Sequence, residues 1–68
     1  MADRLVTQLK DLREAHGLTQ AQLGQMIGVS RKTINTVENG VYVPSTVIAL
    51  KLAAALGVPV EALFSLAE

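Results

Sequence analysis

A group of polar side chains in the middle of the chain has the residue types that bind anions. At about 100° per residue, Arg31, Asn35 and Asn39 fall at positions i, i+4 and i+8 and share one side of a helix. Lys32 and Thr36 stand beside them. This side carries cations, amides and a hydroxyl, and it has no carboxylate. It therefore has the chemistry to donate hydrogen bonds to a polyanion.

The two cations of this group stand where a helix least favours positive charge. Arg31 and Lys32 would occupy the first turn, where the helix dipole disfavours a cation by roughly 0.3–1 kcal/mol each. A helix with only a structural role more often has acids there. A local rule that is broken without compensation is typical of a functional site, and a bound polyanion would remove the conflict. The competing interpretation is a face that only meets solvent.

Two short helices joined by a tight turn are predicted to position this face. Thr19 and Gln22 have the spacing of a capping box, so a helix is expected over about 20–27. Ser30 can cap the next helix, and Gly28 can adopt the left-handed conformation that ends the first. A turn this short makes the helices cross steeply, which is the geometry of a helix-turn-helix unit. The first of these helices is expected to pack its apolar residues inward: Leu23, Met26 and Ile27.

The remainder of the chain predicts three further helices. They are expected over Asp3 to His16, Thr46 to Leu56, and Val60 to about Leu66. The helix over 46–56 is apolar almost all round, so it should be covered on more than one side.

Length and composition predict a single domain over residues 1–68. The chain has no cysteine, which fits a reducing cytoplasm, and its one histidine leaves no ligand cluster for a metal. Neither a membrane span nor a signal peptide is expected. The net charge is +0, but residues 28–51 carry +2 (three cations and one acid) and residues 52–68 carry −2. The positive charge is thus concentrated around the predicted polar face.

At this point the chain resembles a known family. The stretch TQAQLGQMIGVSRKTINTVENG resembles the helix-turn-helix of the phage Cro and repressor family, also called the xenobiotic-response-element type. The resemblance continues through LKDLREAHGLTQ before it, and through YVPS, ALKLAAALGV and EALF after it. It implies an all-α, compact, five-helix lambda-repressor-like domain, with the helix-turn-helix formed by the second and third helices.

The resemblance also implies roles for individual residues. Arg13 and Glu38 would pair across the first and third helices, and Gly24 would allow the third helix to approach closely. Tyr42 either donates to a phosphate or packs over the third helix, and packing is favoured. The residues expected at the DNA are Gln20, Ser30, Arg31, Lys32, Thr33, Asn35, Thr36 and Asn39.

Four valines depart from the family pattern and add apolar surface. Val6, Val41, Val43 and Val47 stand where the family commonly has charged or polar residues. They remove expected phosphate contacts and favour a protein partner.

The function predicted is that of a sequence-specific, DNA-binding transcriptional regulator, a repressor, reading an inverted repeat in double-stranded DNA. A homodimer is expected, with an interface drawn from Leu63, Phe64, Leu66, Val43 and Val47. The alternative is an antitoxin-like or anti-repressor module on the same fold. An enzyme is not expected, because no catalytic constellation can be assembled. Neither a cofactor nor a small-molecule ligand is expected, and the location expected is the cytoplasm.

Overall fold

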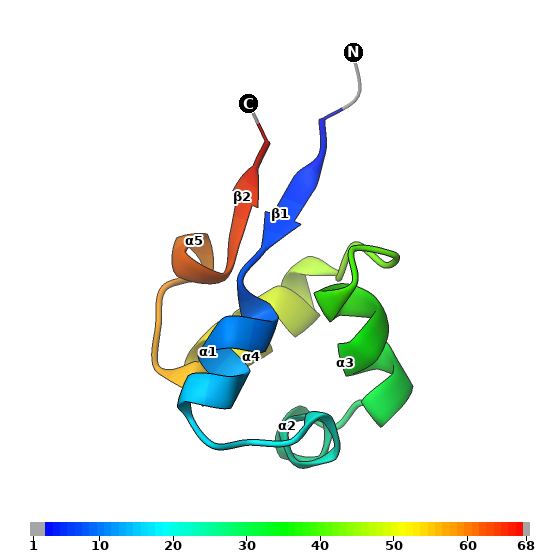
Figure 1. The fold of residues 1–68 in the computed structure, drawn as a ribbon, viewed down its shortest axis with the longest axis vertical. Helices are drawn as coiled ribbons and strands as arrows, with labels where there is room; N and C mark the ends of the chain where they lie inside the picture. Colours follow the sequence, from blue (N-terminus) through cyan, green and yellow to red (C-terminus); the bar gives the residue numbers. More distant parts are fainter. Residues whose placement is uncertain (1–2, 68) are drawn as a thin grey trace.

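The computed structural model describes residues 3–67 as five helices and one small two-stranded sheet (Figure 1). In chain order the elements are β1 (Leu5–Thr7), α1 (Leu9–Ala15), α2 (Gln20–Ile27), α3 (Arg31–Glu38), α4 (Thr46–Leu56), α5 (Val60–Leu63) and β2 (Phe64–Leu66). The two strands project from the helical body, and the molecule measures 36 Å along its longest axis against 21 and 20 Å along the others. The predicted five-helix architecture is confirmed, with the sheet as a minor addition.

The first strand replaces the start of a predicted helix. A helix from Asp3 to His16 was expected, but residues 5–7 are extended and α1 begins only at Leu9. The β-branched Val6 pairs with Ser65 in an antiparallel register, and the N–H of Leu9 donates to the Thr7 hydroxyl at 3.1 Å. Pairing with a distant strand therefore overrides the local helical pattern.

The same pairing shortens the last helix. A helix to about Leu66 was expected, but α5 ends at Leu63 and Phe64 continues as β2. Two backbone hydrogen bonds of 2.8 Å flank the strand pair. The N–H of Gln8 donates to the carbonyl of Leu63, and the N–H of Ala67 donates to the carbonyl of Arg4. The predicted all-α class is confirmed, and this two-stranded ribbon is a minor addition to it.

The hydrophobic core lies between the helices and draws on each of them. Its buried members are Leu9, Leu23, Ile27, Ile34, Val37, Leu52, Ala53, Leu56 and Leu63. The expectation that Met26 packs inward is wrong, because its side chain is 55% exposed on α2. The apolar α4 is covered on one side by this core, yet Val47 and Leu50 stay largely exposed on it. Within residues 3–67, no helix has the length and apolar character needed to cross a membrane.

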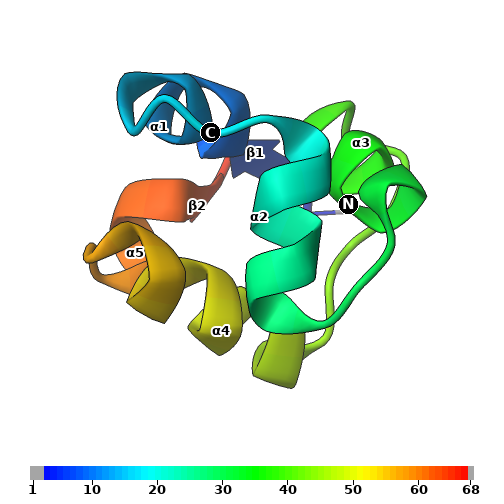
Figure 2. The same cartoon turned by 90° about the horizontal axis from the view of Figure 1, so that it is seen from below.

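The arrangement places α3 at the edge of the molecule. Seen from below, α3 and α5 lie on opposite sides, with α2 and α4 between them (Figure 2). The exposed face of α3 is therefore free to meet a large partner, while the C-terminal elements lie away from it.

Candidate nucleic-acid interface

Local hydrogen bonds fix the helix pair α2 and α3. Thr19 Oγ1 accepts from the N–H of Gln22 at 3.0 Å, and Gln22 Oε1 accepts from the N–H of Thr19 at 2.8 Å, so the predicted capping box is present. Gly28 ends α2 at φ 78°, as expected for a left-handed cap. Ser30 Oγ accepts from the N–H of Thr33 at 3.1 Å and caps α3. The orientation of α3 is thus set by groups close to it in sequence.

Close backbone approach explains the glycine inside α2. A Cβ atom on Gly24 would lie 2.7 Å from the carbonyl oxygen of Val29 and 3.3 Å from that of Ser30. Any side chain there would push the turn away from α2. The expected close approach at Gly24 is confirmed, and it occurs at the turn that enters α3.

The predicted contact residues gather on one surface. Arg31, Lys32 and Asn35 are exposed on α3, and together with Gln20 and Ser30 they line a polar hollow of about 470 Å³. The structure thus brings the start of α2 and the start of α3 together. With two cations in its lining, this hollow can donate hydrogen bonds to a ligand that carries negative charge.

Two other members of the predicted set have their hydroxyls engaged within α3. Thr36 Oγ1 donates to the carbonyl of Thr33 at 2.9 Å, and the Thr33 and Ser30 hydroxyl oxygens are 3.0 Å apart. Asn39 lies at the far end of α3, where its Nδ2 donates to Asn35 Oδ1 at 3.2 Å. Asn39 therefore lies apart from the polar hollow, which is near the start of α3.

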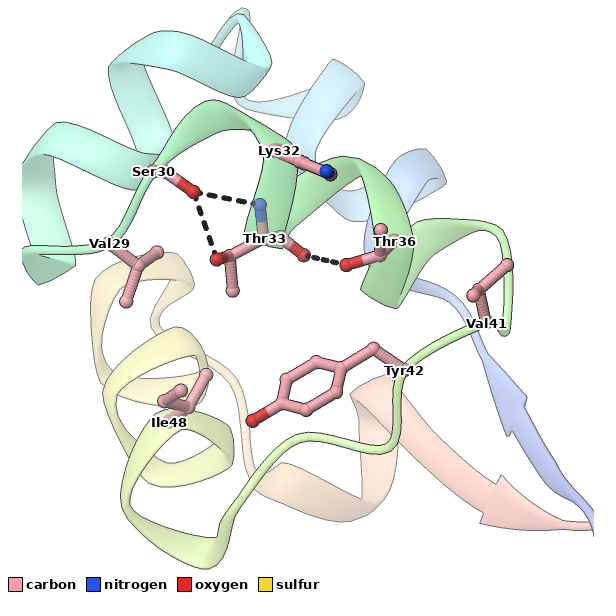
Figure 3. A pocket seen from close by; sticks show the side chains of 8 residues that line it. All are labelled: Val29, Ser30, Lys32, Thr33, Thr36, Val41, Tyr42 and Ile48. Atoms are coloured by element: carbon pink, nitrogen blue, oxygen red, sulfur yellow. Dashed lines mark hydrogen bonds between the residues drawn. The ribbon is translucent and has the colours of Figure 1, made fainter.

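A second hollow lies beside the first and is more apolar (Figure 3). It measures about 450 Å³, and its lining residues are Val29, Ser30, Lys32, Thr33, Thr36, Val41, Tyr42 and Ile48. The Tyr42 ring lies across it with the hydroxyl directed toward Ile48. The backbone N–H of Tyr42 donates to the backbone carbonyl of Thr36 at 3.2 Å. Packing is therefore the role that this geometry favours for Tyr42. Val41 was expected to add apolar surface, whereas Val29 and Ile48 could not be placed here from the sequence, because a single apolar residue does not indicate which surface it lines.

A buried ion pair joins α1 to α3, as the family resemblance implied. Arg13 Nε donates to Glu38 Oε2 at 2.6 Å, and Arg13 Nη2 donates to Glu38 Oε1 at 3.2 Å. Arg13 Nη1 also donates to the carbonyl of Leu18 at 2.8 Å. The hydrogen bond to Glu38 raises the pKa of Arg13 above its ordinary value, against the opposing effect of burial. The pairing with Glu38 thus favours the charged form of the Arg13 guanidinium.

Gln20 is tied to the same carboxylate. Its Nε2 donates to Glu38 Oε1 at 3.0 Å, so Glu38 accepts from both Arg13 and Gln20. Gln20 is the first residue of α2 and Glu38 is the last residue of α3. No local sequence pattern predicts a contact between residues so far apart in the chain.

The predicted dimer residues do not share one environment. Leu63 is fully buried in the core, so the expectation that it meets a second copy is wrong. Phe64 is half-buried, whereas Val43, Val47 and Leu66 are 69, 62 and 62% exposed. Two of them, Val43 and Phe64, line an apolar hollow of about 260 Å³, whose other lining residues are Leu5, Pro44, Thr46, Ala49, Leu50 and Val60.

Comparison with known proteins agrees with this geometry. Residues 9–63 match the helix-turn-helix family model. The chain is 42% identical over 60 residues to the uncharacterized HTH-type transcriptional regulator YgzD of Bacillus subtilis (strain 168), covering 88% of this chain and 91% of that protein. It is 46% identical over 56 residues to the uncharacterized HTH-type transcriptional regulator MJ0272 of Methanocaldococcus jannaschii, covering 82% and 85%.

A solved structure gives the same result for the fold. The restriction-modification controller protein C.AhdI from Aeromonas hydrophila matches with a TM-score of 0.75 and 39% sequence identity, over 79% of this chain and 82% of that one. Fold, exposed helix face and relatives together define the class, which is that of the HTH-type transcriptional regulators. The chain belongs to the helix-turn-helix family of the Cro and repressor type, and it is a DNA-binding transcriptional regulator.

Proposed function

We propose that this regulator binds an inverted-repeat operator as a homodimer and places α3 of each copy in the major groove. The observation that carries the proposal is the exposed surface formed by Arg31, Lys32 and Asn35 beside Gln20 and Ser30. An α-helix fits the major groove, and side chains at its N-terminal end reach the base edges.

The proposed contacts are of two kinds, those to base edges and those to the phosphate backbone of DNA. Arg31 and Lys32 donate to guanine O6 and N7, which are acceptors that both side chains can reach from the first turn. Gln20 holds a phosphate from the start of α2, where backbone N–H groups also point outward. The remaining members contact nearby bases or phosphates: Ser30, Thr33, Asn35, Thr36 and Asn39.

Charge around α3 supports the binding of DNA in spite of the zero net charge. Arg31 and Lys32 stand on α3, and the one acid of α3, Glu38, is already paired with Arg13. The Glu38 carboxylate therefore repels phosphates less than a free acid would. Lys51, the third cation of residues 28–51, lies apart from Arg31 and Lys32 on α4, beside Met26. Few cations nevertheless remain for phosphate contact, so one copy alone would bind weakly and with a shallow salt dependence.

The proposed dimer surface is the apolar patch of Val43, Leu50 and Phe64, which line the 260 Å³ hollow. Leu66 and Val47 are also exposed and apolar, and they would extend the interface. Exposed apolar side chains grouped in this way are typical of an interaction surface. Because α5 and β2 lie away from α3, a two-fold partner on this patch leaves both recognition helices free. The two copies of α3 would then read half-sites about 34 Å apart.

Further parts of the proposal follow from this mode of binding. A dimer on its operator acts as a repressor where the operator overlaps a promoter. The protein works in the cytoplasm, where its DNA lies. Membership of a family of DNA-binding regulators also implies that the chain is not an enzyme.

One observation favours a second candidate, a protein-interaction module of antitoxin or anti-repressor type. Val41 and Val43 are 77% and 69% exposed in the loop after α3, where a DNA-binding surface would profit from cations. In that case the loop would meet a protein, and DNA would bind weakly at every salt concentration.

Selection of bound duplexes from a random pool tests the main proposal. We expect an enriched inverted repeat whose half-site centres lie about one helical turn apart. A titration at two salt concentrations should then show tighter binding to the full repeat than to one half-site. Failure to enrich any sequence would refute the proposal and favour the protein-interaction module.

Sedimentation at micromolar concentration tests the dimer surface. Leu50→Asp should convert a dimer to a monomer, since Leu50 is 56% exposed and the substitution places a charge in the apolar patch. Met26→Asp is the matched control, because Met26 is also exposed and apolar but lines a different hollow, between α2 and α4. A wild-type monomer, or equal effects of both substitutions, would contradict this interface.

A further inference from the structure

We propose that Glu38 is a positioning residue for DNA binding, which holds the side chain of Gln20 in place before DNA arrives. This inference rests on the proposed function, specifically on the phosphate contact of Gln20. Glu38 itself touches no DNA in this arrangement, and it acts through the amide that it binds.

The geometry around Glu38 divides its hydrogen-bonding capacity between two helices. Oε2 accepts from Arg13 Nε at 2.6 Å, while Oε1 accepts from Arg13 Nη2 at 3.2 Å and from Gln20 Nε2 at 3.0 Å. The Glu38 side chain is only 3% exposed, and its carboxylate is held on the Arg13 side by the fixed guanidinium fork. Gln20 therefore binds to a group that cannot move with it.

This contact determines how Gln20 faces the polar hollow. A carboxylate can only accept, so the amide nitrogen of Gln20, and not its oxygen, must face Glu38. One N–H of the amide is engaged there, and the second remains for a phosphate. The backbone N–H of Gln20, in the first turn of α2, has no partner within the helix and is available to the same anion.

The advantage to binding is entropic. A glutamine side chain that must be ordered on binding weakens the complex, and holding it in advance removes that cost. Arg13 extends the effect, because it also binds the carbonyl of Leu18 just before α2. The start of α2 is thereby fixed to the end of α3 through a single carboxylate.

A double-mutant cycle tests the proposal with the full chain and its selected operator. Dissociation constants are measured at one salt concentration for wild type, Glu38→Gln, Gln20→Ala and the double variant. Glu38→Gln should weaken binding by about two- to tenfold in the wild-type background. It should have no further effect when Gln20 is already alanine, since the residue through which it acts is gone.

The outcomes separate this proposal from the function on which it rests. If wild type selects no operator, the proposed function fails. If wild type is selective but Glu38→Gln weakens binding equally in both backgrounds, or Gln20→Ala has no effect, the positioning role is refuted while the function stands.

A measurement on the wild type covers the case in which Glu38→Gln does not fold. The side-chain amide of Gln20 should have a high NMR order parameter without DNA, and that of the exposed Gln25 on the same helix should be low. A Gln20 amide as mobile as that of Gln25 would overturn the proposal.

Discussion

Removal of one carboxylate should destabilise the whole domain. Glu38→Ala leaves the guanidinium of Arg13 buried, with its side chain only 10% exposed and two of its three hydrogen bonds to protein lost. Breaking a buried pair on one side costs about 3–5 kcal/mol. The bond from Gln20 to Glu38 is lost as well, although Gln20 can turn to solvent.

That cost is large on the scale of this chain. At roughly 0.05–0.15 kcal/mol per residue, a chain of 68 residues is stable by about 3–10 kcal/mol. A loss of about 3 kcal/mol should lower the melting temperature by at least about 12 °C, because 1 kcal/mol corresponds to roughly 4–8 °C in domains of this size. If the wild type lies at the lower end of the stability range, this loss is enough to unfold much of the variant.

Thermal melts followed by circular dichroism give the measurement. They are made at one fixed protomer concentration, because the proposed dimerisation would also shift the midpoint. The control is Glu61→Ala, an exposed acid in the first turn of α5, whose loss should cost no more than about 1 kcal/mol. Replacing Arg13 and Glu38 together by methionine and leucine should recover much of the loss, since no buried charge remains. An unchanged midpoint for Glu38→Ala would refute the reasoning.

Three further predictions concern recognition, helix approach and capping. Arg31→Ala combined with Lys32→Ala should abolish discrimination between operator and random duplex in a binding titration, at about 1–3 kcal/mol per lost base contact. Its melting temperature should hold or rise, because two cations leave the positive end of a helix. Gly24→Ala should lower the melting temperature, because a Cβ 2.7 Å from the Val29 carbonyl costs about 1–3 kcal/mol, only partly offset by about 1 kcal/mol of helix propensity; a stabilised variant would contradict this. Ser45→Ala should remove the cap on the N–H of Ile48 and cost about 1 kcal/mol in a urea titration, with operator selectivity unchanged.

The features that were predictable from the sequence are those set by neighbouring residues. Thr19 and Gln22 form the capping box within three residues, and Gly28 ends α2 beside the cap of α3 at Ser30. These bonds form within one turn of chain, so type and spacing determine them. The polar face of α3 follows equally from helical periodicity, because its inward face is anchored by Ile34 and Val37.

The features that were not predictable depend on residues far apart in the chain. Leu5 and Leu66 pair in strands of three residues each, which are too short to show an alternating pattern, and both fit a helical apolar stripe equally well. The burial of Leu63 follows from the same cause. Once the chain turns into β2 after it, the side chain is enclosed by the core and is lost to any partner.

Gln20 shows how a contact with DNA can be proposed for a residue before its surroundings are known. Its place at the start of α2 is a local property, and a phosphate role there needs only the helix terminus. Its partner is decided by the crossing of α2 and α3, which brings residue 38 to within 3.0 Å of residue 20. In the proposed mode of binding, the Glu38 carboxylate contributes both to stability and to DNA recognition, and experiment must separate the two. Glu38→Ala should disturb both, whereas Gln20→Ala leaves the bonds from Arg13 to Glu38 in place and should weaken DNA binding alone.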